Sequence, residues 1–157
     1  MKLKNKLMKL VLILTLMVGC VGLVGCGESK YEKALPKVSE VMAIASKDTG
    51  LKTTIEYNEK AEAYVVLVDG MYTSDQIKRL LKEAESDDEH GLWAVRTITG
   101  WDEVISNFKD INEMIIKILE GEGIEDPKVC LRIIDKETGD VFLTIINETV
   151  MEDVFAQ

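Results

Sequence analysis

The chain has 157 residues, with 19 Lys and Arg against 28 Asp and Glu and a formal net charge of −9. Hydrophobic residues make up 46% of it, which is enough to build the core of one ordinary domain. An acidic surface repels phosphate backbones, so nucleic acid is excluded as the expected partner.

The first 25 residues have the pattern of a secretory signal peptide. Four lysines lie within the first nine residues, where no acidic residue occurs, and residues 10–25 carry no charge. This uncharged run of 16 residues is shorter than the about 20 apolar residues that a membrane-spanning helix needs. We therefore expect residues 1–25 to be cleaved off rather than to stay as a transmembrane anchor.

The end of this run, Leu23-Val24-Gly25-Cys26, is typical of a lipoprotein cleavage box. A small residue is needed beside the scissile bond because the peptide enters the protease extended, and Gly25 meets this need. The Cys26 thiol would then carry a diacylglycerol, and two or three acyl chains such as palmitate anchor a protein stably, since each buried methylene contributes about 0.8 kcal/mol. Cys20 is the alternative site, but cleavage there would leave an apolar region of only ten residues.

These features divide the chain into a signal peptide (1–25), a lipidated tether (26–30) and a single domain (31–157) on the extracytoplasmic face of the cell membrane. Cleavage removes four lysines, leaving 15 basic against 28 acidic residues and a net charge of −13. We expect such a domain to contact the membrane through its lipid rather than by adsorbing on anionic headgroups. Only Cys130 remains besides Cys26, which excludes an internal disulfide.

The first half of the domain is predicted to form one helix and two strands. Apolar residues spaced by three and four predict a helix over 33–47, with Pro36 near its start, where a missing N–H is tolerated. Alternation over 51–57 predicts a half-buried strand. The run 61–68 is apolar on both faces and rich in β-branched residues, so we expect this strand inside the sheet.

Two central helices are expected next. Thr73 and Gln76 have the spacing of a capping box and open a helix that ends in the polar segment 86–91. Residues 92–99 fit a strand by propensity and a helix by their apolar stripe, and we favour the helix. From Trp101 the stripe is unambiguous until the glycines at 121 and 123; its members are Trp101, Ile105, Phe108, Ile111, Ile115, Ile118 and Leu119.

The end of the chain predicts two strands, 128–134 and 141–146, joined by a polar loop, with residues 147–157 forming a short last helix. The expected fold is α+β, in the order α-ββ-αα-ββ. Its four-stranded antiparallel sheet carries the two central helices on one face and the N-terminal helix over part of the other. What stays uncovered there is the candidate binding face, formed by Tyr64, Val66, Phe142 and Ile146.

This layout resembles a group of small lipoproteins of Gram-positive, often gut-dwelling, bacteria that carry a domain of unknown function. The resemblance rests on the lipobox, the polar tether, the helix pair of about 45 residues, and the closing Asp-Pro-Lys-Val-x-Leu-Arg-Ile-Ile-Asp (126–135) with its Glu-Thr-Gly-Asp hairpin. It covers nearly the whole chain. It implies an extracytoplasmic location at the cell surface and brings no catalytic residue with it.

No residue pattern indicates catalysis or metal binding. His90 is the only histidine, so a Ser-His-Asp or Cys-His centre would have to use it, and we interpret it as a solvated loop residue. Residues 87–90 could offer ligands to Ca²⁺ or Zn²⁺, but four consecutive side chains point in different directions.

We interpret Cys130 as a small buried hydrophobic residue. A reactive thiol is the alternative, because Arg132 on the same face could supply the cation that it needs. Trp93 and Trp101 could stack on a sugar, but aromatic residues in the apolar stripe of a helix are usually core residues.

We therefore expect a membrane-anchored, non-enzymatic binding or interaction module without cofactor, acting on a protein, peptide or cell-envelope partner. A small envelope hydrolase using acidic residues or His90 is one alternative. A structural protein of the envelope is the other.

Substitution of Cys26→Ala should leave the precursor unprocessed or release the protein from the lipid-anchored fraction, because no thiol remains to accept the diacylglycerol. Metabolic labelling with a fatty-acid analogue measures this. Label that persists in Cys26→Ala and disappears in Cys20→Ala would move the anchor to Cys20.

Overall fold

The computed structural model describes residues 30–47, 49–85 and 91–156. In chain order the elements are α2 (Lys30–Ser46), β1 (Lys52–Asn58), β2 (Ala63–Asp69), α3 (Ser74–Glu85), α4 (Gly91–Thr99), α5 (Trp101–Gly121), β3 (Lys128–Ile134), β4 (Val141–Ile146) and β5 (Thr149–Asp153). None of the helices in these ranges has the length and apolarity that a bilayer-spanning segment requires. The predicted signal peptide and Cys26 lie outside the described residues and stay predictions.

The strands form one mixed sheet in the order β1-β2-β3-β4-β5, in which β2 and β3 are parallel and the other neighbours antiparallel. The α+β prediction is confirmed, but the four-stranded antiparallel sheet is wrong. The reason lies in the connection between β2 and β3. It contains three helices, which carry the chain back along the sheet, so that β3 starts at the same end as β2 and runs parallel to it.

The fifth strand replaces the short last helix that we expected over 147–157. Asn147 has φ of 50°, a left-handed conformation that Asn tolerates better than most residues, and the chain reverses there within two residues. Val150 then pairs with Ile145 across the last two strands. The acidic composition of the tail concealed this strand, because an edge strand exposes most of its side chains.

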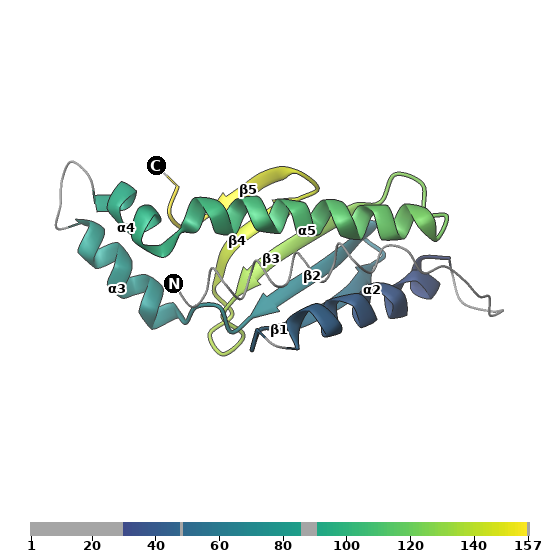
Figure 1. Cartoon of the computed structure of the whole chain (residues 1–157), viewed down its shortest axis with the longest axis horizontal. Helices are drawn as coiled ribbons and strands as arrows, with labels where there is room; N and C mark the ends of the chain where they lie inside the picture. Colours follow the sequence, from purple (N-terminus) through teal and green to yellow (C-terminus); the bar gives the residue numbers. More distant parts are fainter. Residues whose placement is uncertain (1–29, 48, 86–90, 157) are drawn as a thin grey trace.

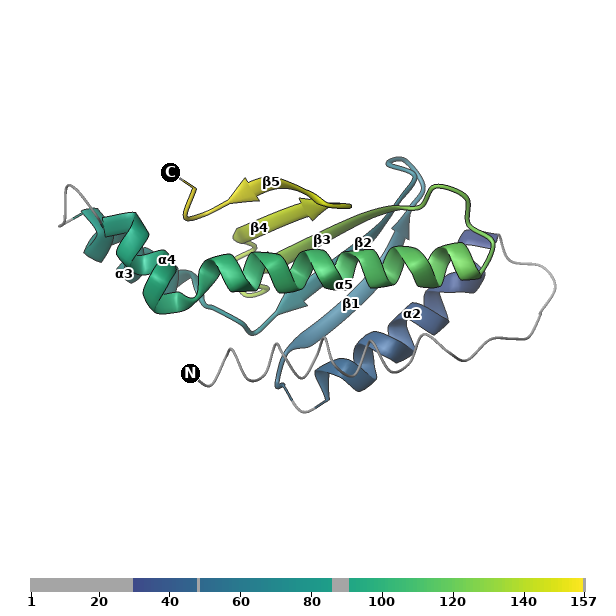
Figure 2. The same ribbon diagram turned by 45° about the horizontal axis from the view of Figure 1, so that its top comes forward.

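Both long helices cover the same face of the sheet. Figures 1 and 2 show α5 lying along β3 and β4, and α2 beside it next to β1. The two central helices were expected together on this face, with the first helix on the other; both expectations are wrong. α3 and α4 pack on each other beyond the end of the sheet (Figure 1).

Local signals at the helix ends were interpreted correctly. In the capping box of α3, Gln76 N–H donates to Thr73 Oγ1 at 3.3 Å and Thr73 N–H donates to Gln76 Oε1 at 2.9 Å. The segment 91–99 is a helix, as favoured. It begins at Gly91 because α3 passes so close that a Cβ there would lie 1.9 Å from the Ala84 carbonyl oxygen. Gly100, with φ of 65°, then separates α4 from α5.

The apolar stripe of α5 forms the centre of the core, as its spacing predicts. Phe108, Ile111 and Ile115 are fully buried. The strands that α5 contacts are β3 and β4, where Leu131 and Ile145 are paired and fully buried. Trp101 is also fully buried, whereas Trp93 is 60% exposed, so the two tryptophans do not share the core.

A half-buried carboxylate fastens the C-terminal segment to the start of α5. Asp153 accepts hydrogen bonds from Trp101 Nε1 at 2.7 Å and from Arg96 Nη1 at 2.8 Å. Arg96 Nη1 also donates to the Phe155 carbonyl oxygen at 2.7 Å, and its guanidinium pairs with Asp102. The ring of Phe155 meets the Trp101 indole edge to face, with centroids 5.0 Å apart. The Asp153 side chain therefore joins β5 to α4 and α5.

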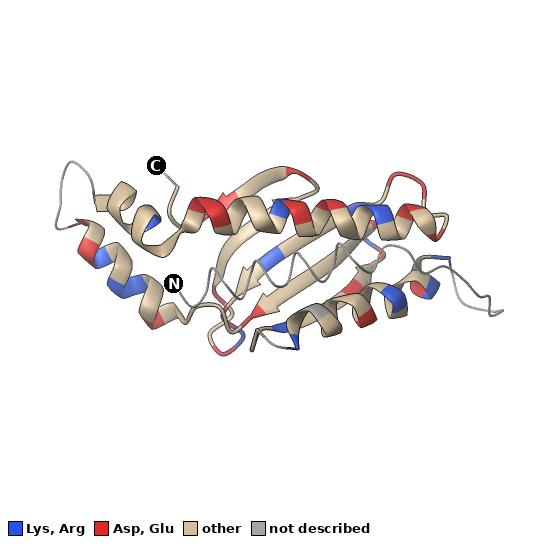
Figure 3. Cartoon of the chain, in the orientation of Figure 1, with Lys and Arg blue, Asp and Glu red and all other residues tan. Residues whose placement is uncertain are grey.

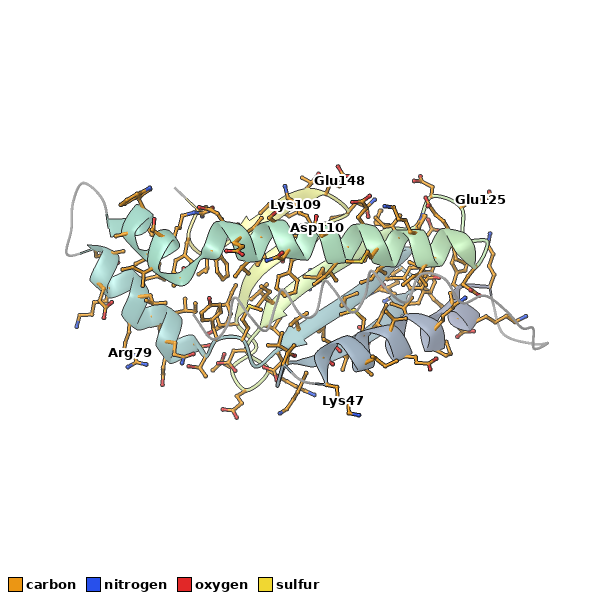
Figure 4. The ribbon with its side chains drawn as sticks, in the orientation of Figure 1. Lys47, Arg79, Lys109, Asp110, Glu125 and Glu148 are labelled. Carbon is orange, nitrogen blue, oxygen red and sulfur yellow. The ribbon has the colours of Figure 1, made fainter. Side chains whose placement is uncertain are left out.

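Substituting Phe108→Ala or Ile115→Ala should lower the free energy of unfolding by about 2 to 5 kcal/mol, the range for large-to-small changes in a core. Denaturant titration of the mature protein measures this. Lys109→Ala and Glu113→Ala are the matched controls on the outer side of α5, where Glu113 pairs only with Lys117 (Figure 4 labels Lys109). They should cost about 0.5 kcal/mol or less. Equal losses for Phe108→Ala and Lys109→Ala would show that the inner face of α5 is assigned wrongly.

Candidate functional site

The four residues of the predicted binding face do not form one surface. Cross-strand pairing of Tyr57 with Tyr64 and of Ile55 with Val66 places Tyr64 and Val66 on the helix-covered face, where they are 1% and 0% exposed. Phe142 is also buried, and half-buried Ile146 lies on the opposite face. The β1–β2 loop explains the error, since a shift of one residue in a hairpin exchanges the two faces of a strand.

The sheet face that the described helices leave uncovered is mixed in character. Val65 and Leu67 are half-buried there, among the exposed side chains of Thr54, Glu56 and Arg132. Within the described ranges the exposed large hydrophobic residues are Trp93, Ile98 and Met151, so this face has no exposed aromatic patch. The expected aromatic binding surface is therefore missing from the sheet.

Aromatic side chains gather instead at the end of the domain where the chain enters α2. Tyr31 comes from the first turn of α2, Tyr57 from the end of β1 and Tyr64 from the start of β2. The rings of Tyr31 and Tyr57 are stacked, with centroids 4.8 Å apart and planes at 5°; those of Tyr57 and Tyr64 are 5.0 Å apart and tilted by 54°. Tyr64 Oη donates to the Tyr31 carbonyl oxygen at 3.1 Å.

These rings border a pocket of about 140 Å³, which we call the tyrosine pocket. It lies at the right-hand end of the molecule in Figure 1, between the start of α2, the β1–β2 turn and the α5–β3 loop. Its lining residues are Tyr31, Tyr57, Glu62, Tyr64, Ile124, Glu125, Asp126, Pro127 and Lys128. Four separate segments thus build the site, which is why no single stretch of sequence displays it.

Tyr57 and Tyr64 have raised pKa values, and the pocket rim is acidic. Burial, followed by the neighbouring Tyr31 and the Glu62 and Glu59 carboxylates, raises the pKa of Tyr57. Burial also raises the pKa of Tyr64 to about 12. Glu62 and Asp126 on the rim have φ of 48° and 50°, a left-handed backbone conformation that non-glycine residues seldom adopt and that tends to occur at binding sites.

A cation already lies on this cluster. The Lys30 ammonium is 5.3 Å from the centroid of the Tyr31 ring, within the distance at which the negative face of an aromatic ring attracts positive charge. Among the described residues, the pocket lining combines tyrosine rings and carboxylates and includes no Ser, Cys or His.

A second hollow lies on the outer side of α3 and is larger, about 430 Å³. The described residues that line it are Asp75, Lys78, Arg79 and Lys82, all exposed and all from one helix. Figure 3 shows these basic residues on α3, and Arg79 extends away from the body of the molecule in Figure 4. Mobile side chains of one helix enclose a ligand poorly, so we favour the tyrosine pocket despite its smaller volume.

The other residues that the sequence analysis considered for catalysis or metal binding give no candidate site among the described residues. Cys130 is 8% exposed, which confirms its interpretation as a buried hydrophobe. Residues 87–90, including His90, lie outside the described residues. Within the described ranges no three His, Cys, Asp or Glu side chains come together to hold a metal ion.

One pair that the sequence did not suggest is Ser74 with Asp135. Asp135 Oδ2 accepts from Ser74 N at 2.8 Å and from Ser74 Oγ at 2.9 Å. These bonds, led by the backbone N–H of Ser74, lower the pKa of the Asp135 carboxyl. The described residues include no histidine to act as a base, and we interpret the pair as a cap that fixes the start of α3 to the β3–β4 loop.

Comparison with known proteins gives no further guide to the site. No protein-family model, no curated protein and no solved structure matches the chain. The resemblance to small Gram-positive lipoproteins therefore stays a prediction from the residues.

The Tyr64 phenol should make the protein less stable as pH rises from about 10 to about 12. Its pKa is about 12 in the folded state against 10.0 unfolded, so only the unfolded chain releases the proton in this range, and unfolding becomes easier. Tyr64→Phe should flatten this decline without abolishing it, because burial also raises the pKa of Tyr72 to about 12.

Denaturant titrations of wild type and Tyr64→Phe across this pH range measure the effect. Below pH 10 the variant should be less stable by about 1 kcal/mol, through loss of the hydrogen bond to Tyr31. An identical pH dependence in both proteins would contradict the raised pKa.

Proposed function

We propose that this protein is a membrane-anchored, extracytoplasmic lipoprotein that acts as a non-enzymatic binding module, with the tyrosine pocket as its ligand site. The observation that carries the proposal is the pocket itself, in which three tyrosines and a strained acidic rim come together from four segments of the chain. Pockets lined by aromatic rings with a few polar groups are the usual form of ligand sites.

The position of the pocket supports a role at the membrane. Tyr31 follows the predicted lipidation site Cys26 by five residues, which span at most about 17 Å when fully extended. With Cys26 lipidated, the pocket would therefore lie within this distance of the bilayer surface. A ligand at or near the membrane would be within its reach.

The two alternatives have less support. A hydrolase with a Ser or Cys nucleophile and a His base has no support from the described lining of the pocket, in which none of these residues occurs. A structural or protein-interaction role has one favourable observation: Trp93 and Ile98 on α4, at the end of the molecule away from the pocket, are 60% and 82% exposed. Isolated exposed apolar residues are common on protein surfaces, so this observation is the weaker one.

A ligand screen tests the proposed site. The mature lipoprotein in non-ionic detergent is screened by thermal shift against a balanced set of small organic cations, anions, sugars and short peptides. Ligands that stabilise the wild type should lose their effect in Tyr57→Leu, which removes the central ring of the cluster. They should keep it in Asp140→Asn, which removes an exposed carboxylate from the β3–β4 loop, at the opposite end of β3 from the pocket.

The ligand-induced shift is compared within each variant, so any loss of basal stability in Tyr57→Leu does not affect the result. Ligands that stabilise all three proteins equally would place the binding site elsewhere. A screen in which no compound stabilises the wild type would remove the pocket as a small-molecule site.

A further inference from the structure

We propose that the ligand of the tyrosine pocket is a compact organic ammonium ion, either a quaternary ammonium group or the terminal ammonium of an alkylamine. This inference rests on the proposed function, because it names the ligand class of the same site. Three properties of the pocket support it: its size, its aromatic lining and its charge.

The size of the pocket restricts the ligand to a small group. At about 140 Å³ it is well below the roughly 300 to 1,000 Å³ of pockets that enclose drug-sized molecules. One water molecule occupies about 30 Å³ of the liquid, so the pocket has room for only about four or five groups of that size. A trimethylammonium head or the end of an aminoalkyl chain fits this space, whereas a nucleotide or an oligosaccharide does not.

The aromatic lining attracts positive charge. Tyrosine rings present negative faces to a cation, and the attraction grows when both partners are shielded from water. The Lys30 ammonium, 5.3 Å from the Tyr31 centroid, shows that the cluster accepts this chemistry from its own chain. Because the pKa of Tyr57 is raised and that of Tyr64 is about 12, both hydroxyls keep their protons and remain neutral hydrogen-bonding groups for such a ligand.

The charges around the pocket select against anions. Glu62, Glu125 and Asp126 line it, and the nearby positive charges are Lys128 in the lining and Lys30 over the Tyr31 ring, so acidic groups are in excess. Glu62, together with Glu59, is also close enough to Tyr57 to act on its hydroxyl electrostatically. An anion would be repelled by these carboxylates, whereas an ammonium ion would be attracted to them.

Titration calorimetry with defined probes tests the inference on the mature lipoprotein in non-ionic detergent. The probes are choline, cadaverine and the uncharged carbon isostere of choline, in which a quaternary carbon replaces the nitrogen. We expect at least one ammonium probe to bind. The neutral isostere should bind about tenfold more weakly or worse, since it has the shape of choline without its charge.

Three variants locate the binding. Glu62→Gln, which keeps the shape of the side chain and removes its charge, should weaken ammonium binding about three- to tenfold. Tyr57→Leu should weaken it by tenfold or more. Asp140→Asn should bind like the wild type, because this carboxylate lies at the opposite end of β3 from the pocket.

The outcomes separate this inference from the proposed function. Equal binding of choline and its neutral isostere, lost in Tyr57→Leu, would refute the ammonium ligand and leave the pocket as a binding site. Binding that is unchanged in both Glu62→Gln and Tyr57→Leu would refute both proposals. The absence of any binding of these probes to the wild type would refute the ammonium ligand alone, and the ligand screen would still decide the pocket. Competition by vesicles with choline headgroups would extend the ligand class to membrane lipids, and its absence would restrict the class to soluble amines.

Discussion

Burial of one face of α5 against β3 and β4 is the contact on which the rest of the fold depends. The chain contains no disulfide within its described residues, and Cys130 is free, so the core alone holds the domain together. Leu131 and Ile133 of β3 are fully buried under the helix, and so is Val66 of β2. Because α2 lies beside α5 on the same face, it too is positioned by this contact, and with it the first tyrosine of the pocket.

The parallel pairing has a consequence for where a ligand can bind. β2 and β3 start at the same end of the sheet, so the β1–β2 turn and the α5–β3 loop meet there. The start of α2 reaches the same end, which places Tyr31 over the ring of Tyr57. An antiparallel pairing would have moved the loop before β3 to the far end, and the pocket would have lost half of its wall.

Local patterns in the sequence were sufficient to predict most elements. The stripe from Trp101, the capping box at Thr73 and Gln76, and the alternation in β1 all depend on neighbours within a few residues, and the structure confirms them. The direction of β3, the partners of each sheet face and the strand in the tail depend on long-range pairing, which local spacing does not reveal. The tyrosine pocket was missed for the same reason, although Tyr57 and Tyr64, placed on either side of a turn, were a signal of a cross-strand aromatic pair.

The carboxylate of Asp153 also bears on how the protein reaches its location. Trp101 and Arg96 find this partner only in β5, 52 and 57 residues further along the chain. If the protein is exported in the direction from its N-terminus, the junction of α4 and α5 stays incomplete until residues 153–155 have crossed the membrane. A polypeptide that must be threaded through a translocation channel benefits from such a delay, because early folding on the inner side would stop its passage. This junction would then form on the outer side of the membrane, where the protein is proposed to work.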